Sequence, residues 1–175
     1  NTISQINEVD SVLEEIENEL ENIDQYLYSS TFQEKLKKQI TKFNKYFSSV
    51  SYELYGEKYA LTYDIINNKK TNKPVYKFST FNSNMSSGKK QGEILCFDLA
   101  YIMFADEEGI SCLHFLLNDK KELMHDNQLS KVADFVMKRN IQLVISILKD
   151  KLPNYLLDKA NVVIELSQED KLFRI

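Results

Sequence analysis

The sequence predicts an α/β fold, with a mixed sheet that has a parallel strand–helix–strand part, an antiparallel hairpin, and an N-terminal coiled-coil helix. Apolar residues recur in steps of three and four over residues 6–27, and at every second residue within residues 51–81. From residue 85 onward, helical and strand-like patterns alternate, as in parallel sheets with crossover helices. The 175 residues suffice for one compact domain and an appendage. We therefore expect an acidic coiled-coil helix at residues 1–30 and a globular lobe at residues 31–175.

The N-terminal segment concentrates the negative charge of the chain. Residues 1–31 contain eight acidic residues and no lysine or arginine, which gives this segment a charge of −8 when the whole chain has −4. The apolar seam consists of Ile6, Val9, Leu13, Ile16, Leu20, Ile23 and Leu27. This pattern favours a coiled coil whose partner helix, upstream in a longer protein, supplies compensating basic residues. The alternative is an amphipathic helix that packs on its own domain.

A second helix and a hairpin are expected next. Thr31 and Glu34 form a capping-box signature, which predicts a helix through about Phe47. The outer face of this helix is either a solvated surface or a nucleic-acid contact, and it carries Lys35, Lys37, Lys38, Lys42 and Lys45. The alternation between Ser51 and Phe81 predicts an antiparallel hairpin or meander.

The remaining chain predicts alternating helices and strands. We expect a helix over about 89–108 that Gly109 ends, a buried strand over 112–117, a helix over 128–139 and a strand over 142–147. Two short strands are expected near 162–166 and 172–175. His114 is expected to be a structural residue within the sheet.

Two segments of this part carry chemistry. Met85 to Gln91 places serines and a glycine at the start of a helix, where free backbone N–H groups favour a phosphate. Asp119 follows a buried strand, at the end where open parallel sheets bind ligands, and could hold Mg²⁺. The alternatives are an ordinary helix cap and an aspartate that closes a loop.

The order and spacing of these segments resemble the C-terminal lobe of SMC-like ABC-type ATPase heads. They resemble more closely a bacterial C-terminal domain family of unassigned function that is found on SMC-like coiled-coil ATPases. Met85–Lys89 resembles the signature motif, Leu116–Asp119 the Walker B strand, and Asp126, seven residues further on, the D-loop aspartate. The resemblance implies that Ser86, Ser87, Gly88 and Lys89 contact ATP phosphate in trans. It also implies that Asp119 binds Mg²⁺ and that Asp126 lies at the dimer interface.

The sequence departs from this family at the position of its catalytic glutamate. Lys120 follows Asp119, and an ammonium group cannot act there as a general base. The family's switch histidine is also missing, because Leu148-Lys149-Asp150 occupies its region. Glu122 and His125 are the remaining candidates for a catalytic group, so whether the assembled head hydrolyses ATP is left open.

The chain also lacks a phosphate-binding loop. Its glycines, at positions 56, 88, 92 and 109, do not allow a Gly-x-x-x-x-Gly-Lys-Ser/Thr segment. We therefore expect residues 31–175 to be half of an ATPase head, inactive alone. The resemblance implies as partners an N-terminal Walker A half of the same protein, a second head, ATP with Mg²⁺, and DNA. The alternative function is a non-catalytic coiled-coil interaction module on a degenerate ATPase fold.

The remaining features indicate a cytoplasmic protein. No apolar run approaches the roughly 20 residues that a membrane-spanning helix needs, and no signal peptide is visible. Cys96 and Cys112 have neither metal-ligand spacing nor the density of a disulfide scaffold, which favours a reducing compartment.

Overall fold

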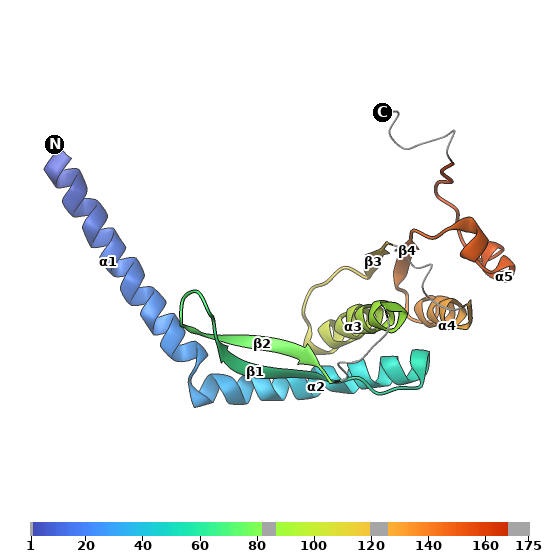
Figure 1. The fold of residues 1–175 in the computed structure, drawn as a ribbon, viewed down its shortest axis with the longest axis horizontal. Coiled ribbons are helices and arrows are strands. Elements are labelled where there is room, and N and C mark those ends of the chain that lie inside the picture. Colours follow the sequence, from blue (N-terminus) through green and yellow to red (C-terminus); the bar gives the residue numbers. More distant parts are fainter. Residues whose placement is uncertain (1, 82–86, 120–125, 168–175) are drawn as a thin grey trace. The chain divides into compact units, whose positions relative to one another are not determined.

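A computed structural model describes residues 2–81, 87–119 and 126–167, with only the backbone described for residues 87–89 and 126. The chain divides into two compact units, residues 1–45 and residues 46–175. Within the described ranges, five α-helices and four strands confirm the mixed α/β class (Figure 1). In chain order the elements are α1 (Thr2–Leu27), α2 (Ser30–Tyr55), β1 (Leu61–Asn67), β2 (Pro74–Thr80), α3 (Ser87–Glu108), β3 (Phe115–Asn118), α4 (Asp126–Met137), β4 (Gln142–Ile145), the short 3₁₀ helix η1 (Lys149–Lys151) and α5 (Asn154–Leu157).

Helix α1 is the predicted acidic helix, and its apolar seam is open to solvent. No residue of α1 is buried. Large seam side chains such as Leu13 and Leu20 remain about half exposed, at 51% and 55%. An exposed apolar stripe of this length is unfavourable in water, because covering it would remove apolar surface from solvent. The helix is confirmed, and its pairing with a second helix stays a prediction.

The start of α2 corrects the predicted cap. The Ser29 hydroxyl accepts a hydrogen bond from the Phe32 N–H at 3.2 Å and donates one to the Tyr26 carbonyl at 2.7 Å. Ser29 is therefore the N-cap, and Thr31 already lies inside the helix. The prediction of a capping box at Thr31 was wrong because one serine hydroxyl serves both the last turn of α1 and the first turn of α2.

Helix α2 runs eight residues beyond the predicted end at Phe47, so residues 51–55 are helical and do not belong to the hairpin. Buried Phe47, Val50 and Leu54 continue the helical spacing on one face, which outweighs the weaker alternation in this stretch. Gly56 ends the helix with φ +72°, and its N–H donates to the Tyr52 carbonyl at 2.8 Å. This left-handed conformation favours glycine.

The predicted hairpin is confirmed as the antiparallel pair β1–β2, whose register runs from Leu61 opposite Thr80 to Asn67 opposite Pro74. Tyr63 and Tyr76 pack edge to face across the pair, with ring centroids 5.6 Å apart. Such cross-strand aromatic pairs stabilise a register.

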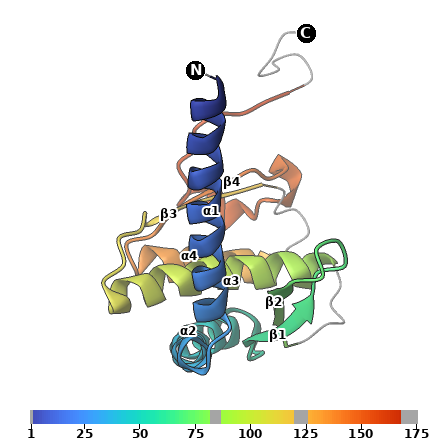
Figure 2. The same cartoon turned by 90° about the vertical axis from the view of Figure 1, so that its left-hand side faces the viewer.

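The predicted parallel part is confirmed as the unit β3–α4–β4. Strands β3 and β4 pair in parallel, from Phe115 opposite Gln142 to Asn118 opposite Ile145. Among the described residues, the four strands form two separate two-stranded sheets. Within the second unit, α3 lies between the last turns of α2 and the β3–β4 pair (Figures 1 and 2).

One predicted strand is absent. Residues 161–167 have no regular secondary structure, and Val163 is 82% exposed. A strand needs a neighbouring ladder, and none of the described segments pairs with this one. The strand expected over 172–175 lies outside the described residues.

No described helix combines the length and apolarity needed to cross a bilayer.

The core of the second unit is built on the last turns of α2. The buried Phe47 ring packs edge to face on Phe97 of α3, at 5.8 Å between centroids, and against Tyr59 at 5.9 Å. Further buried side chains come from α3, α4 and the residues just beyond them, and they include Leu95, Leu99, Ile102, Leu129, Val132, Phe135 and Ile141. Three helices therefore share one apolar core.

Ser51 is the fully buried polar group of this core. Its hydroxyl accepts a hydrogen bond from the Tyr59 N–H at 2.9 Å and donates to the Ser48 carbonyl at 3.2 Å. Through these two bonds, the serine ties the segment that follows α2 back to the helix.

We expect Ser51→Ala to lower the free energy of unfolding by about 1–3 kcal/mol, because the buried Tyr59 N–H loses its acceptor. Thermal and urea unfolding followed by circular dichroism measure this change. Ser49→Ala, at an exposed position of the same helix, is the control and should change stability by less than about 0.5 kcal/mol. Equal stability of the two variants would contradict the assigned role of Ser51.

Candidate functional site

The predicted signature segment lies at the start of α3. Ser86 is outside the described residues, whereas Ser87, Gly88 and Lys89 form the first turn of this 22-residue helix. The helix begins two residues earlier than expected. Backbone N–H groups in a first turn have no partner within the helix, so this turn can receive an anion. The contact with ATP phosphate stays a prediction.

Asp119 lies immediately after β3 and is exposed. The preceding residue, Asn118, is buried, and its carbonyl accepts a hydrogen bond from the Ser146 N–H at 3.0 Å. This bond fixes the carboxyl end of β3 to the residue that follows β4. Asp119 is therefore presented to solvent at the carboxyl edge of a parallel strand pair, where ligands of open α/β sheets bind. A role in binding Mg²⁺ stays a prediction.

The remaining predicted site residues are only partly placed. Asp126 is the first residue of α4, with its side chain outside the described part. Lys120, Glu122 and His125 lie outside the described residues altogether. The predicted catalytic and D-loop contacts therefore stay predictions.

Tyr55 is a contact of α3 that sequence reasoning missed. Its ring lies against Gly92, where a Cβ would overlap the phenol. The hydroxyl is buried without a hydrogen-bond partner in the described part of the chain, and burial raises the pKa of Tyr55 well above its usual range. The phenol is therefore neutral, and its ring holds α3 one turn beyond the predicted signature segment. In the sequence, the only signal of this contact was Gly92, a single glycine near the start of the predicted helix.

His114 differs from the prediction that placed it within the sheet. It lies just before β3, and its side chain is 36% exposed. The ring Nε2 lies 2.9 Å from Asp106 Oδ1, at the C-terminal end of α3. The backbone carbonyl of His114 accepts the Gln142 N–H at 2.8 Å, so the residue extends the pairing of β3 with β4 by its main chain alone.

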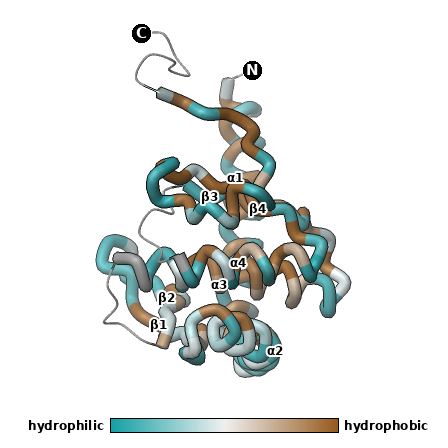
Figure 3. Tube along the Cα trace, turned by 90° about the vertical axis from the view of Figure 1, so that its right-hand side faces the viewer, coloured by the Kyte–Doolittle hydropathy of each residue, from teal (hydrophilic) through white to brown (hydrophobic). Residues whose placement is uncertain are grey.

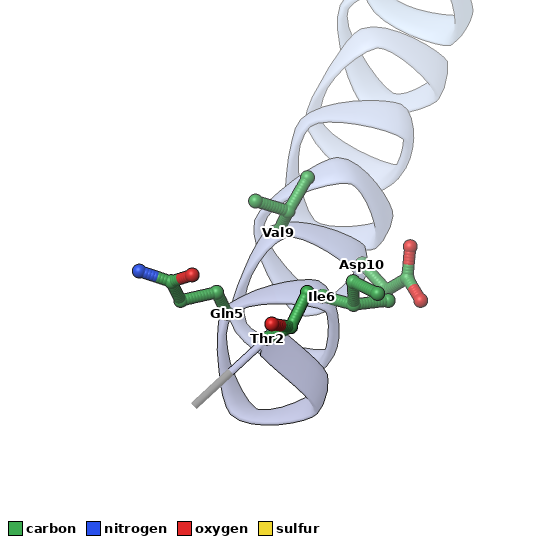
Figure 4. Close-up of a pocket in the computed structure, with 5 residues that line it drawn as sticks. All are labelled: Thr2, Gln5, Ile6, Val9 and Asp10. Carbon is green, nitrogen blue, oxygen red and sulfur yellow. The ribbon is translucent and has the colours of Figure 1, made fainter.

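Two shallow hollows are open to solvent. Figure 4 shows the first, which is bordered only by side chains from the opening turns of α1, namely Thr2, Gln5, Ile6, Val9 and Asp10. One helix cannot enclose a ligand, so this hollow belongs to the uncovered surface of α1. The second is bordered by Tyr46, Ile102, Met103, Asp106, Glu107, Arg139 and Ile141. Arg139 there is paired with Glu53 at 3.0 Å and stacks on the Phe135 ring.

The fold and the candidate site define a mixed α/β lobe in which the predicted signature segment begins α3 and Asp119 follows β3, the first strand of the parallel strand–helix–strand unit. The chain belongs to the family DUF2326, described as an uncharacterised protein conserved in bacteria, which matches residues 50–175. This match confirms the predicted bacterial family of unassigned function. A comparison with curated proteins found no match.

Solved structures of SMC proteins are similar to this chain at low identity. One comes from a study of ATP-driven dimerization and DNA stimulated activation of SMC ATPases. It is 19% identical, with a TM-score of 0.48 over 78% of this chain and 83% of that chain. Another is a chain from the SmcHead bound to the C-winged helix domain of ScpA. It is 16% identical, with a TM-score of 0.41 over 74% of this chain and 41% of that chain.

We expect Gly92→Ala to destabilise the protein by about 1–3 kcal/mol, because the new methyl group overpacks the rigid Tyr55 ring. Alanine alone would favour the helix by up to about 1 kcal/mol, so the sign of the change reports the packing. Urea unfolding measures it. Lys90→Ala, at an exposed position of α3, is the control. A Gly92→Ala protein as stable as wild type would show that Tyr55 can move aside freely.

Proposed function

We propose that this chain is the C-terminal half of an SMC-like ATPase head, which supplies a signature motif and a Walker B aspartate for ATP-dependent dimerisation of two heads. In this proposal, an N-terminal half of the same protein supplies the phosphate-binding loop, and the isolated chain is inactive. Two observations support this proposal, namely the motif order of the sequence and the exposed face of β3 in the two-stranded parallel sheet.

One face of β3 is open to solvent, unlike the strands of a covered parallel sheet. Phe115 and Leu117 alternate onto one face of β3 and are 42% and 73% exposed. Parallel sheets are normally covered on both faces, and two strands alone rarely make a stable sheet. The apolar segment 161–167, close to the C-terminal end in Figure 3, likewise has none of the described strands beside it. These features support a lobe whose sheet is completed by strands from another half of the head.

The placement of the predicted motifs supports the same proposal. The predicted signature segment enters α3, Asp119 follows β3, and Asp126 begins α4. Ligands of open α/β sheets bind at the carboxyl ends of strands, so Asp119 would hold Mg²⁺ beside the ATP of its own head. The N-terminus of α3 can receive an anion and would contact the phosphate of ATP on the other head. Phosphate oxygens and one carboxylate are a suitable ligand set for Mg²⁺. ATP and Mg²⁺ are therefore the proposed cofactors of the assembled head.

Lys120 limits the chemistry that we propose. The general base for water attack would have to come from Glu122 or His125, or hydrolysis would be slow. ATP would then act mainly to hold two heads together. A role on DNA belongs to the proposal through the motif resemblance, and the exposed lysines of α2, such as Lys37 and Lys38, are compatible with it.

We expect ATP with Mg²⁺ to dimerise the full-length wild-type protein, and Ser86→Arg and Asp119→Ala to abolish dimerisation. The arginine blocks the proposed phosphate contact in trans, and the alanine removes the proposed metal ligand. Light scattering measures dimerisation, and phosphate release measures hydrolysis.

Matched controls are Ser49→Arg on α2 and Asp158→Ala after α5, both at exposed positions. They should dimerise as wild type does. A wild-type protein whose mass does not change with ATP, or variants that dimerise normally, would favour the non-catalytic interaction module.

The exposed seam of α1 generates a separate expectation for the partner helix. In the full-length protein, Leu13→Glu and Leu20→Glu should each lower the stability of the helical arm by about 2 kcal/mol or more, because an apolar contact is lost and a charge is buried. Asn18→Glu, on the opposite face of α1, is the control. Far-ultraviolet circular dichroism during heating measures the unfolding. Equal melting of all three variants would indicate that the seam has no partner.

A further inference from the structure

A histidine, a cysteine and an aspartate converge where α3 ends. Asp106 lies in the last turn of α3, and Cys112 and His114 lie in the segment that leads to β3. His114 Nε2 is 2.9 Å from Asp106 Oδ1, and one ligand atom from each of the three side chains lies within 4.8 Å of the other two. Asp106 is exposed, and the other two residues are partly buried.

The backbone holds this cluster in place. Gly109, with φ +66°, follows the last turn of α3, and its N–H donates to the Asp106 carbonyl at 3.3 Å. The next N–H, of Ile110, reaches back to the Ala105 carbonyl at 2.8 Å. These two bonds form a Schellman motif, which reverses the chain and returns it along the end of the helix. At the other end of the segment, the bond from the Gln142 N–H fixes the main chain of His114 to β4.

We propose that Asp106, Cys112 and His114 form a binding site for a divalent transition metal ion, with Zn²⁺ as the natural occupant. Zn²⁺ takes thiolate sulfur at about 2.3 Å and imidazole nitrogen or carboxylate oxygen at about 2.0–2.2 Å, in tetrahedral geometry. Neighbouring ligand atoms around such an ion are roughly 3.3–3.6 Å apart. The oxygen–nitrogen pair is already close to this spacing, and the sulfur, no more than 4.8 Å from either atom, has to move closer when an ion binds.

The ligand types separate this site from the proposed Mg²⁺ site at Asp119. A thiolate and an imidazole favour zinc or its neighbours, whereas Mg²⁺ prefers oxygen ligands. Three protein ligands leave the fourth position of a tetrahedral ion for water, as the partial exposure of the cluster allows. Glu107 and Glu108, next in the chain, add negative charge that attracts a cation.

A bound ion would join the end of α3 to the segment before β3. These two elements carry the predicted signature segment at the start of α3 and Asp119 after β3. The ion would cross-link the end of α3 to the segment before β3, and so restrict the motion of one relative to the other, without contacting either motif. The metal site is independent of ATP binding, and the two proposals can fail separately.

Titration of the metal-free full-length protein with Co²⁺, under reducing conditions, tests the site directly. Co²⁺ takes the place of Zn²⁺ and gives visible ligand-field bands and a near-ultraviolet thiolate-to-cobalt band. We expect one ion per chain, displacement by Zn²⁺, and no displacement by excess Mg²⁺. Cys112→Ser should remove the thiolate band, and His114→Gln and Asp106→Asn should each weaken binding at least about tenfold.

Cys96→Ala is the matched control, because the thiol of Cys96 is fully buried in the core and burial raises its pKa well above the usual range. This variant should keep the thiolate band. Circular dichroism verifies that each variant is folded. The proposal is overturned if folded wild type gives no thiolate band with saturating Co²⁺, if Cys112→Ser retains the band, or if a folded Cys96→Ala loses it.

Discussion

The packing of the last turns of α2 against α3 is the constraint on which the second unit depends. Phe47 contacts Phe97 at one point, and Tyr55, two turns later in α2, lies against Gly92, earlier in α3. Later residues of one helix meet earlier residues of the other, so the two helices are antiparallel. Because Gly92 admits the Tyr55 ring, the first turn of α3 is held close to α2. The contact between Tyr55 and Gly92 therefore helps to fix the position of the predicted phosphate-binding turn.

Much of the fold follows from periodicity in the sequence. The seam of α1, the alternation in β1 and β2, and the order β3–α4–β4 are all local patterns, and each was predictable. The end of α2 was not, because residues 51–55 satisfy two periods and only the burial of Leu54 in the core decides between them. The strand expected near residue 163 failed for the opposite reason. Its local pattern is correct, but a strand forms only when a second strand lies beside it.

The candidate sites differ in the same way. The signature segment and Asp119 could be proposed from sequence because their chemistry follows from positions at the ends of a helix and a strand. The cluster of Asp106, Cys112 and His114 could not, since the spacing of these residues matches no familiar metal motif. Their proximity depends on the positive φ of Gly109 and on a main-chain hydrogen bond to β4, and only the folded structure reveals these two features. A histidine assigned to the sheet is for this reason found beside a carboxylate.

The open β3–β4 pair also bears on how this protein is made in the cell. Among the described residues, the edge of the β3–β4 pair with exposed Leu117 and the apolar segment near Val163 have no further strand beside them, so they offer a template for pairing between copies of the chain. Such surfaces are most hazardous during synthesis, before their intended neighbours are available. If the proposed N-terminal half supplies further strands, they are translated first and can cover this edge as it emerges from the ribosome. The order of the two halves along one polypeptide would then protect against aggregation.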